Sequence, residues 1–364
     1  MNFTWVCILL LLIISGMFIE LFTKCNGKVM AIAIIFFYVL IVSARAVDVV
    51  PDTEVYVAVY ETLEISSFDG GSFNLGFLLL MKICQKLGLP YSVFFGVIAV
   101  LNYIIVYAGC RMLTENTEKT IIDGFYEKKK KPYYCLFSAI YLPYFGFFYN
   151  CIVLRQGIAM SLLILAFAFL MREKYIHYVI IVIVAILFHS SAVIGFSFLL
   201  FKGGYKHMSS LRYLAWWMGI LFFWLSHLGL LFMKILPAVT RFIYKITGLS
   251  AFEHYERFTQ DIRNAFWGKK ELFFLLLGFI YAVAFYKKKN EKLLFPFFVG
   301  ISLAFLVEYM MISYRIVDYF LLFYVPLGFV YMMNRKATWV NYMGVSCCCL
   351  IQMVISGNVI GYYR

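Results

Sequence analysis

The residues best suited to chemistry lie between Asn150 and Gly195, where two strongly apolar runs carry polar side chains. Arg155 and Gln156 interrupt the first run, and His189 and Ser190 interrupt the second. A charged side chain near the middle of a bilayer helix costs about 2.5–3.5 kcal/mol on insertion scales, so it normally faces a polar cavity or an anionic partner. Arg155 is therefore the first functional candidate.

Structural interpretations of the same residues stay open. Arg155 lies only a few residues into its run, where an arginine can snorkel to the interface and act as an anchor. His189 alone is equally well a satisfied polar side chain inside a helical core. The functional interpretation is favoured by Gln156 beside Arg155 and by Gly157 and Ala159, which keep that helix surface thin.

The composition indicates a membrane protein. The chain has 364 residues, of which 64% are hydrophobic, 20% aromatic and only 14% charged. Apolar runs of about 20 residues recur, each long enough to cross a hydrocarbon core of about 30 Å. We predict an all-α, polytopic integral membrane protein with one transmembrane domain over residues 1–364, about ten full spans, a re-entrant hairpin and outer interfacial helices.

Charge and cysteine usage exclude other classes. The net charge of +13 is expected from Lys and Arg in cytoplasmic loops, so no nucleic-acid partner is predicted. The nine cysteines show no metal-ligand spacing with histidine, and most lie in apolar runs, where cysteine behaves as a small hydrophobe. The sequence therefore predicts no metal, no cofactor and no disulfide framework.

Hydropathy and loop charge give a topology. The predicted spans cover residues 3–22, 29–44, 91–110, 132–149, 152–171, 213–236, 271–286, 293–312, 316–333 and 338–360. Acidic residues in the segment from 45 to 73 place the loop over 45–90 outside, and residues 237–270 form a second outer loop. We predict an amphipathic helix over 74–89 with Lys82 and Lys86 on one side, and an interfacial helix over Tyr255, Phe258, Ile262 and Phe266.

The segment from 176 to 201 lies between two basic turns that should both be cytoplasmic. It must then enter the membrane and return, which predicts a broken hairpin with His189, Ser190 and Ser191 at its tip. Irregular backbone at membrane depth survives where protein or a water-filled cavity covers it, so the tip favours a cavity. The alternative is one long tilted span.

On this map several polar groups reach the outer side. They are Arg45 with Asp52 and Glu54, Arg155 with Gln156, Glu308 with Arg315 and Asp318, and His189 with Ser190, and the long loop adds Tyr255 and Arg257 as supporting candidates. Guanidinium groups match two oxygens of a phosphate or pyrophosphate, so Arg45, Arg155 and Arg315 predict an anionic lipid headgroup as ligand. Gln156, beside Arg155, is predicted to bind the same pyrophosphate. Either Asp52 or His189 would accept a proton from a sugar hydroxyl.

Two alternatives apply to this set. Arg315 and Asp318 are three residues apart, so they can simply pair on one helix face. Asp52 and Glu54 can be solvated loop acids. No glycine-rich phosphate loop appears in the sequence, so nucleotide hydrolysis receives no support. No Ser-His-Asp order appears either.

Several motifs match a known family in order. They are Arg45 followed by Asp52, Thr53 and Tyr56, then Gly76-Phe77, LRQGIA at residues 154–159, FHSSA at 188–192 and YRIVDYF at 314–320. On these residues the chain resembles the EpsG family of Wzy-like polysaccharide polymerases, which are bacterial membrane proteins. The chain departs from the family in carrying Val50-Pro51-Asp52 where Gly-Thr-Asp is common, and Asn74 where an acidic residue is common.

The resemblance implies glycosyl transfer between polyprenyl-pyrophosphate-linked oligosaccharides on the outer face of the bacterial cytoplasmic membrane, in capsule, exopolysaccharide or O-antigen synthesis. The implied partners are the lipid-linked donor and acceptor, membrane lipids, a chain-length regulator and other assembly proteins. Two other functions remain. A flippase or transporter of lipid-linked sugars should show pseudo-symmetric halves, which the sequence lacks. A lipid-phosphate-sugar-dependent glycosyltransferase would use an acidic pair such as Asp52 with Glu54.

Overall fold

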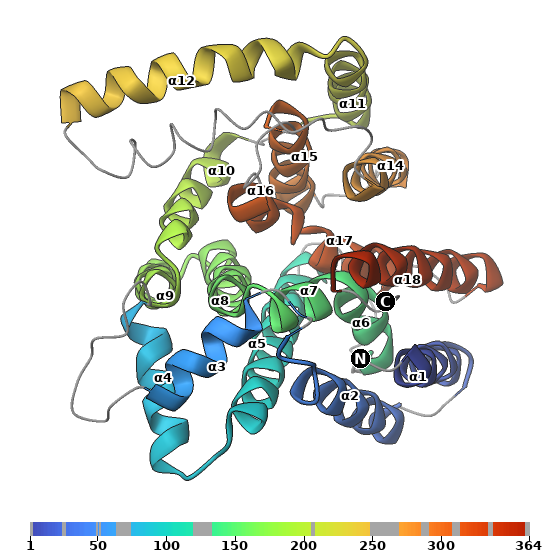
Figure 1. Cartoon of the computed structure of the whole chain (residues 1–364). Coiled ribbons are helices and arrows are strands. Elements are labelled where there is room, and N and C mark those ends of the chain that lie inside the picture. The colour runs from blue at the N-terminus through green and yellow to red at the C-terminus, as the bar shows by residue number, and fades with distance from the viewer. Residues whose placement is uncertain are drawn as a thin grey trace. The chain divides into compact units, whose positions relative to one another are not determined.

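Helices make up the computed structural model, and its described residues form no strand (Figure 1). The structure describes residues 3–23, 27–48, 50, 52–62, 74–118, 133–204, 208–247, 269–284, 291–307, 314–333 and 338–360. Within these ranges five helices are long and apolar enough to cross a bilayer: Thr4–Phe22, Tyr91–Thr114, Leu154–Met171, Ile316–Met333 and Trp339–Gly357. The predicted class, a polytopic helical membrane protein, is confirmed. The number of about ten crossings stays a prediction.

The chain divides into two compact units, which are described separately. The first, Met1–Phe196 with Val325–Arg364, contains α1 (Phe3–Phe22), α2 (Lys28–Ser43), α3 (Thr53–Thr62), α4 (Leu75–Lys86), α5 (Tyr91–Glu118), α6 (Tyr134–Tyr141), the π-helical η1 (Leu142–Gly146), α7 (Phe147–Cys151), α8 (Leu154–Met171), α9 (Tyr175–Phe188), nearly all of the 3-10 helix η2 (Ser190–Ser197), most of α17 (Tyr324–Met333) and α18 (Trp339–Ile360). The second, Ser197–Tyr324, contains α10 (Phe198–Gly204), α11 (Ser210–Leu225), α12 (Leu228–Thr247), α14 (Lys269–Ala284), α15 (Glu291–Leu306) and α16 (Tyr314–Leu321).

Helix α8 is the centre of the first unit, packed between α5 and α9. Its contact with α5 is close because Gly109 carries no side chain: a Cβ there would lie 2.9 Å from the Ile164 side chain. The short turn Arg172–Lys174 joins α8 to α9, so the two helices run antiparallel. Arg155 in the first turn of α8 and His189 after the last turn of α9 therefore lie at the same end of this pair.

The chain reverses direction at His189. Helix α9 ends at Phe188, His189 adopts an extended backbone, and η2 then folds back along α9. The Tyr178 hydroxyl donates a hydrogen bond to the Gly195 carbonyl at 2.5 Å, although these residues lie on opposite sides of the break. A Cβ on Gly195 would lie 2.6 Å from the Leu163 side chain, so η2 also packs on α8. The predicted break and return at His189 are confirmed, and the alternative of one long span is wrong.

The predicted span over 132–149 is not one regular helix. Helices α6 and α7 are separated by the π-helical turn Leu142–Gly146, which contains Pro143. Proline has no N–H to donate, and a π-turn inserts a residue into the helical register. Polar side chains satisfy two of the carbonyls here: Ser356 donates to Pro143 at 2.6 Å and Tyr38 donates to Gly146 at 2.6 Å.

The predicted span over 213–236 is not one continuous helix. Helix α11 stops at Leu225, and the next residues close a turn in which His227 has a left-handed backbone with φ 54°. The amides of Ser226 and His227 bond to the carbonyls of Phe222 and Trp224, as in a normal helix C-terminus. The chain then restarts as α12. Hydropathy alone averages over such a turn, because its flanking residues are all apolar.

Helix α4 matches the predicted amphipathic helix in length but not in orientation. Lys82 is buried, whereas Leu79, Ile83 and Leu87 are exposed. Around a membrane protein the exterior is hydrocarbon, so an apolar helix face can point outward while a lysine points into the protein. Lys82 and Lys86 lie on one side of the helix as predicted, but Lys86 is exposed whereas Lys82 points into the protein.

Candidate functional site

Arg45 is a buried charged residue of the first unit. It lies two residues after the end of α2, and only 4% of its surface is exposed. Its Nη1 donates to the Asn150 carbonyl at 2.6 Å, and its guanidinium carbon lies 3.6 Å from the centre of the Phe95 ring. The Cys151 sulfur is also nearby, but Arg45 Nε and Nη2 have no hydrogen-bond partner among the described residues. Burial lowers the pKa of Arg45, and Cys151 and Tyr56 partly offset this effect.

Asn150 is held by a buried polar network at the end of the π-turn. Its side-chain amide donates to the Tyr38 hydroxyl at 2.6 Å and to the Gly146 carbonyl at 2.9 Å. Asn102 on α5 donates to the Asn150 side-chain oxygen at 2.6 Å. With both ends of its amide engaged, Asn150 has a fixed position, and its carbonyl orients Arg45.

Arg155 contacts Tyr56 on α3, which is also close to Arg45. Burial raises the pKa of Tyr56, and the Arg155 guanidinium, which forms a side-chain hydrogen bond with it, lowers this pKa. Asp52 raises the same pKa and Arg45 lowers it, so both charges lie within electrostatic range of the Tyr56 hydroxyl. The structure thus brings Arg45, Asp52 and Arg155 together around Tyr56, a residue absent from the predicted site.

The start of α3 adds a further donor. Asp52 has a left-handed backbone with φ 61°, is exposed, and its carbonyl accepts a hydrogen bond from the Tyr56 amide at 3.1 Å. Thr53, one turn before Tyr56, is fully buried, and its hydroxyl has no hydrogen-bond partner among the described residues. Residues three apart share a helix face, so this hydroxyl lies on the face that carries Tyr56.

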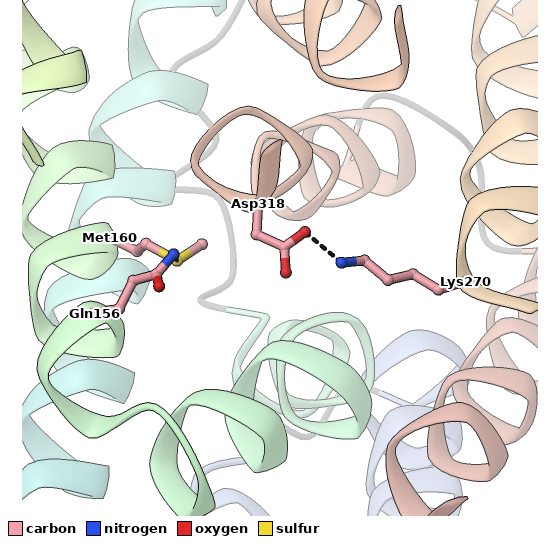
Figure 2. A network of polar contacts seen from close by, with 4 residues as sticks. All are labelled: Gln156, Met160, Lys270 and Asp318. Atoms are coloured by element: carbon pink, nitrogen blue, oxygen red, sulfur yellow. Dashed lines mark hydrogen bonds and ion pairs between the residues drawn. The ribbon is translucent and has the colours of Figure 1, made fainter. Parts of the chain in front are cut away.

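The other predicted residues of the first unit have local partners. Nδ1 of His189 lies 2.6 Å from the Ser191 hydroxyl, which orients the ring, and Ser190 is exposed at the start of η2. Gln156 is fully buried, and its amide donates to the Met160 sulfur at 3.7 Å (Figure 2). Gln156 thus contacts the next turn of its own helix.

The second unit holds a buried ion pair. Asp318 on α16 is fully buried, and its Oδ1 lies 2.5 Å from Nζ of Lys270 on α14, whose side chain is 17% exposed. Figure 2 shows the two side chains pointing toward one another. Asp318 thus has a partner on another helix, and Lys270 was not among the predicted site residues.

Some predictions cannot be followed in the structure. Glu308, Tyr255 and Arg257 lie outside the described residues, and so does the predicted interfacial helix around Tyr255. Arg315 belongs to α16, but its side chain is outside the described part. Among the described residues no group of three His, Cys, Asp or Glu side chains could hold a metal ion.

Comparison with known families decides the identity of the chain. The EpsG family model matches residues 28–362, which is nearly the whole chain. The chain belongs to the EpsG family. This family is related to the Wzy-like polysaccharide polymerases, so the protein is a polysaccharide polymerase-like membrane protein. No curated protein and no solved structure matches the chain.

The structure explains one glycine of this EpsG-family chain, Gly157 in the LRQGIA segment. A Cβ there would lie 2.6 Å from the Tyr149 carbonyl oxygen and 2.9 Å from the Tyr149 Cβ. A backbone atom cannot rotate away, so an added methyl must push α8 from α7. Glycine at position 157 lets α8 lie close to α7, which carries Asn150, and the Asn150 carbonyl orients Arg45.

Replacing Gly157 with alanine is expected to lower the free energy of unfolding by about 1–3 kcal/mol, the usual cost of overpacking. Thermal unfolding in detergent micelles would measure it. The matched control is Gly344→Ala on α18, where a Cβ meets nothing within 4 Å. Equal stability of the two variants would show that α7 and α8 do not approach each other this closely.

Proposed function

We propose that this EpsG-family protein is a polysaccharide polymerase that joins polyprenyl-pyrophosphate-linked oligosaccharide repeat units by glycosyl transfer. The growing chain leaves its lipid pyrophosphate and is transferred to a hydroxyl at the non-reducing end of a new repeat unit. We place the reaction on the outer face of the bacterial cytoplasmic membrane, and its substrates are a lipid-linked donor and a lipid-linked acceptor. Family membership and the arginine cluster support the proposal.

One observation carries the chemical part. Arg45 is almost fully buried, has no carboxylate partner among the described residues, and keeps two guanidinium nitrogens without hydrogen-bond partners there. A buried charge is costly unless it is paired, so an anion is the expected complement. Arg155 also interacts with Tyr56, and two guanidinium groups suit the two phosphates of a pyrophosphate.

The leaving group makes these contacts catalytic in the proposed reaction. As the glycosidic C–O bond to the pyrophosphate breaks, negative charge grows on the departing oxygen. Arg45 and Arg155 would stabilise that charge, and fixed donors in a low-dielectric site act strongly because they need not reorganise. The hydroxyls of Thr53 and Tyr56 would supply further donors.

The acceptor hydroxyl must lose a proton as its oxygen attacks the sugar carbon. Asp52 is the first candidate for this base, because it is exposed and lies within electrostatic range of Tyr56. His189 is the second, since it lies at the end of the α8–α9 pair that carries Arg155. Gln156 and Ser190 are retained as supporting residues. Asp318 forms an ion pair with Lys270, so we assign it a structural role.

The reaction can be tested with the purified protein in nanodiscs. Given a synthetic polyprenyl-pyrophosphate oligosaccharide, the protein is expected to form a ladder of longer oligosaccharides and to release one polyprenyl pyrophosphate for each bond formed. Gel electrophoresis of labelled sugar and mass spectrometry of the lipid would follow both products.

Other outcomes would identify other functions. Movement of the lipid-linked sugar across a sealed vesicle without release of pyrophosphate would indicate a flippase. Addition of a single sugar from a lipid-phosphate donor, without further growth, would indicate the other class of membrane glycosyltransferase. Either result would contradict the polymerase proposal.

A further inference from the structure

Helix α12 presents an apolar face that the other described residues leave exposed. Leu231, Ile235, Phe242 and Ile246 recur at spacings that place them on one side of a helix. These side chains are 57%, 52%, 64% and 68% exposed. Elsewhere on α12, Gly229 is buried, and the helix contacts α11 and α15. The exposed side is therefore not the side by which α12 is attached.

A cationic stripe runs along the edge of this apolar face. Lys234, Arg241 and Lys245 are all exposed, and their spacing puts them about 100° around the helix from the apolar centre. The helix contains no acidic residue. Apolar residues beside a one-signed cationic stripe are typical of helices that lie in a membrane surface, where the apolar side meets acyl chains and the cations meet lipid phosphates.

The geometry favours a surface position over a crossing. α12 has 20 residues, a sufficient length, yet it is not among the helices apolar enough to span. The turn at Ser226 and His227 separates it from α11, and Figure 1 shows α12 running at a steep angle to α11. A helix joined at such an angle to an apolar helix that enters the bilayer runs along the bilayer plane.

We infer that α12 is an interfacial helix whose apolar face, Leu231, Ile235, Phe242 and Ile246, lies in the acyl-chain boundary of the bilayer, with Lys234 and Lys245 at phospholipid phosphates. Helix α12 contains none of the residues of the arginine cluster, so its position at the bilayer does not depend on the proposed reaction. The surface that α12 contacts is lipid and not a protein partner, because its cations border its apolar face as the headgroup layer borders the acyl chains.

Tryptophan fluorescence of the full-length protein in phosphatidylglycerol nanodiscs with brominated acyl chains tests contact with lipid directly. Phe242→Trp adds a tryptophan on the apolar face, and Tyr244→Trp adds one on the opposite side of the same helix. Relative to the unmodified protein, the tryptophan at 242 is expected to show at least about twofold greater quenching than the one at 244. Equal quenching would overturn the inference, since a covering protein segment or water would protect both positions alike.

The cationic stripe has its own test. In the Phe242→Trp protein, Lys234→Gln with Lys245→Gln should reduce the quenching of the added tryptophan in phosphatidylglycerol nanodiscs, and high salt should do the same. Unchanged quenching would contradict the assignment of Lys234 and Lys245 to lipid phosphates. Polymer formation is not the readout, so failure here and failure of the proposed reaction are distinguishable.

Discussion

Cells that carry Arg155→Ala in place of the normal protein are expected to accumulate single lipid-linked repeat units and to make almost no long polysaccharide. The variant removes a guanidinium that would stabilise the charge growing on the leaving pyrophosphate. Loss of one such preorganised donor typically lowers kcat by about 10²- to 10³-fold. Chain length of extracted polysaccharide, compared at equal membrane abundance of the protein, measures the effect.

Two controls separate chemistry from folding. Arg172→Ala removes an arginine from the other end of α8, where its Nη2 donates to the Met112 carbonyl at 3.1 Å, and should leave polymer length nearly normal. Arg155→Lys keeps the charge but loses the planar fork of donors, so intermediate chain lengths are expected. Full-length polymer from Arg155→Ala would exclude Arg155 from the mechanism and return it to an anchoring role.

Replacing Lys270 with methionine should be among the most destabilising single changes outside the candidate site. It would remove the ammonium that lies 2.5 Å from the fully buried Asp318 carboxylate. Breaking a buried ion pair on one side commonly costs about 3–5 kcal/mol. Thermal unfolding in detergent micelles, followed by circular dichroism, would measure the loss.

Substitutions of Asp318, alone and together with Lys270, make this prediction specific. Asp318→Asn leaves the partly exposed Lys270, whose ammonium can reach polar surroundings, and should cost less. The double variant Lys270→Met with Asp318→Leu removes both charges and is expected to recover most of the stability. If Lys270→Met alone were as stable as the normal protein, Asp318 would have another partner or be protonated.

Composition and motif spacing predicted much of the fold and part of the site. Runs of about 20 apolar residues are sufficient to predict a helical membrane protein, since little else can satisfy the backbone in hydrocarbon. Arg45, Asp52 and Arg155 were predicted because charged residues stand out against apolar surroundings, and the structure gathers them around Tyr56. The reversal at His189 was predicted from the charge of the turns on either side.

Other features carried no such signal. Asn102 and Asn150 are ordinary polar residues in the sequence, and only the folded backbone brings them together. Tyr56 belongs to the family motif, but nothing in the sequence marks it as the residue that Arg45, Asp52 and Arg155 approach. Lys270 lies directly beside Lys269 and reads as one member of a basic flank. The inward orientation of Lys82 was missed because the usual rule, polar outward, reverses when the surrounding medium is lipid.

The π-helical turn at Leu142–Gly146 makes the spacing of residues part of the candidate site. Each residue added to or removed from a helix rotates everything after it by about 100°. A single deletion between residues 134 and 149 would swing Asn150 away from Tyr38 and Asn102, and Arg45 would lose its carbonyl anchor although every side chain was still present. Within this apolar segment, therefore, length should be under stricter selection than side-chain identity.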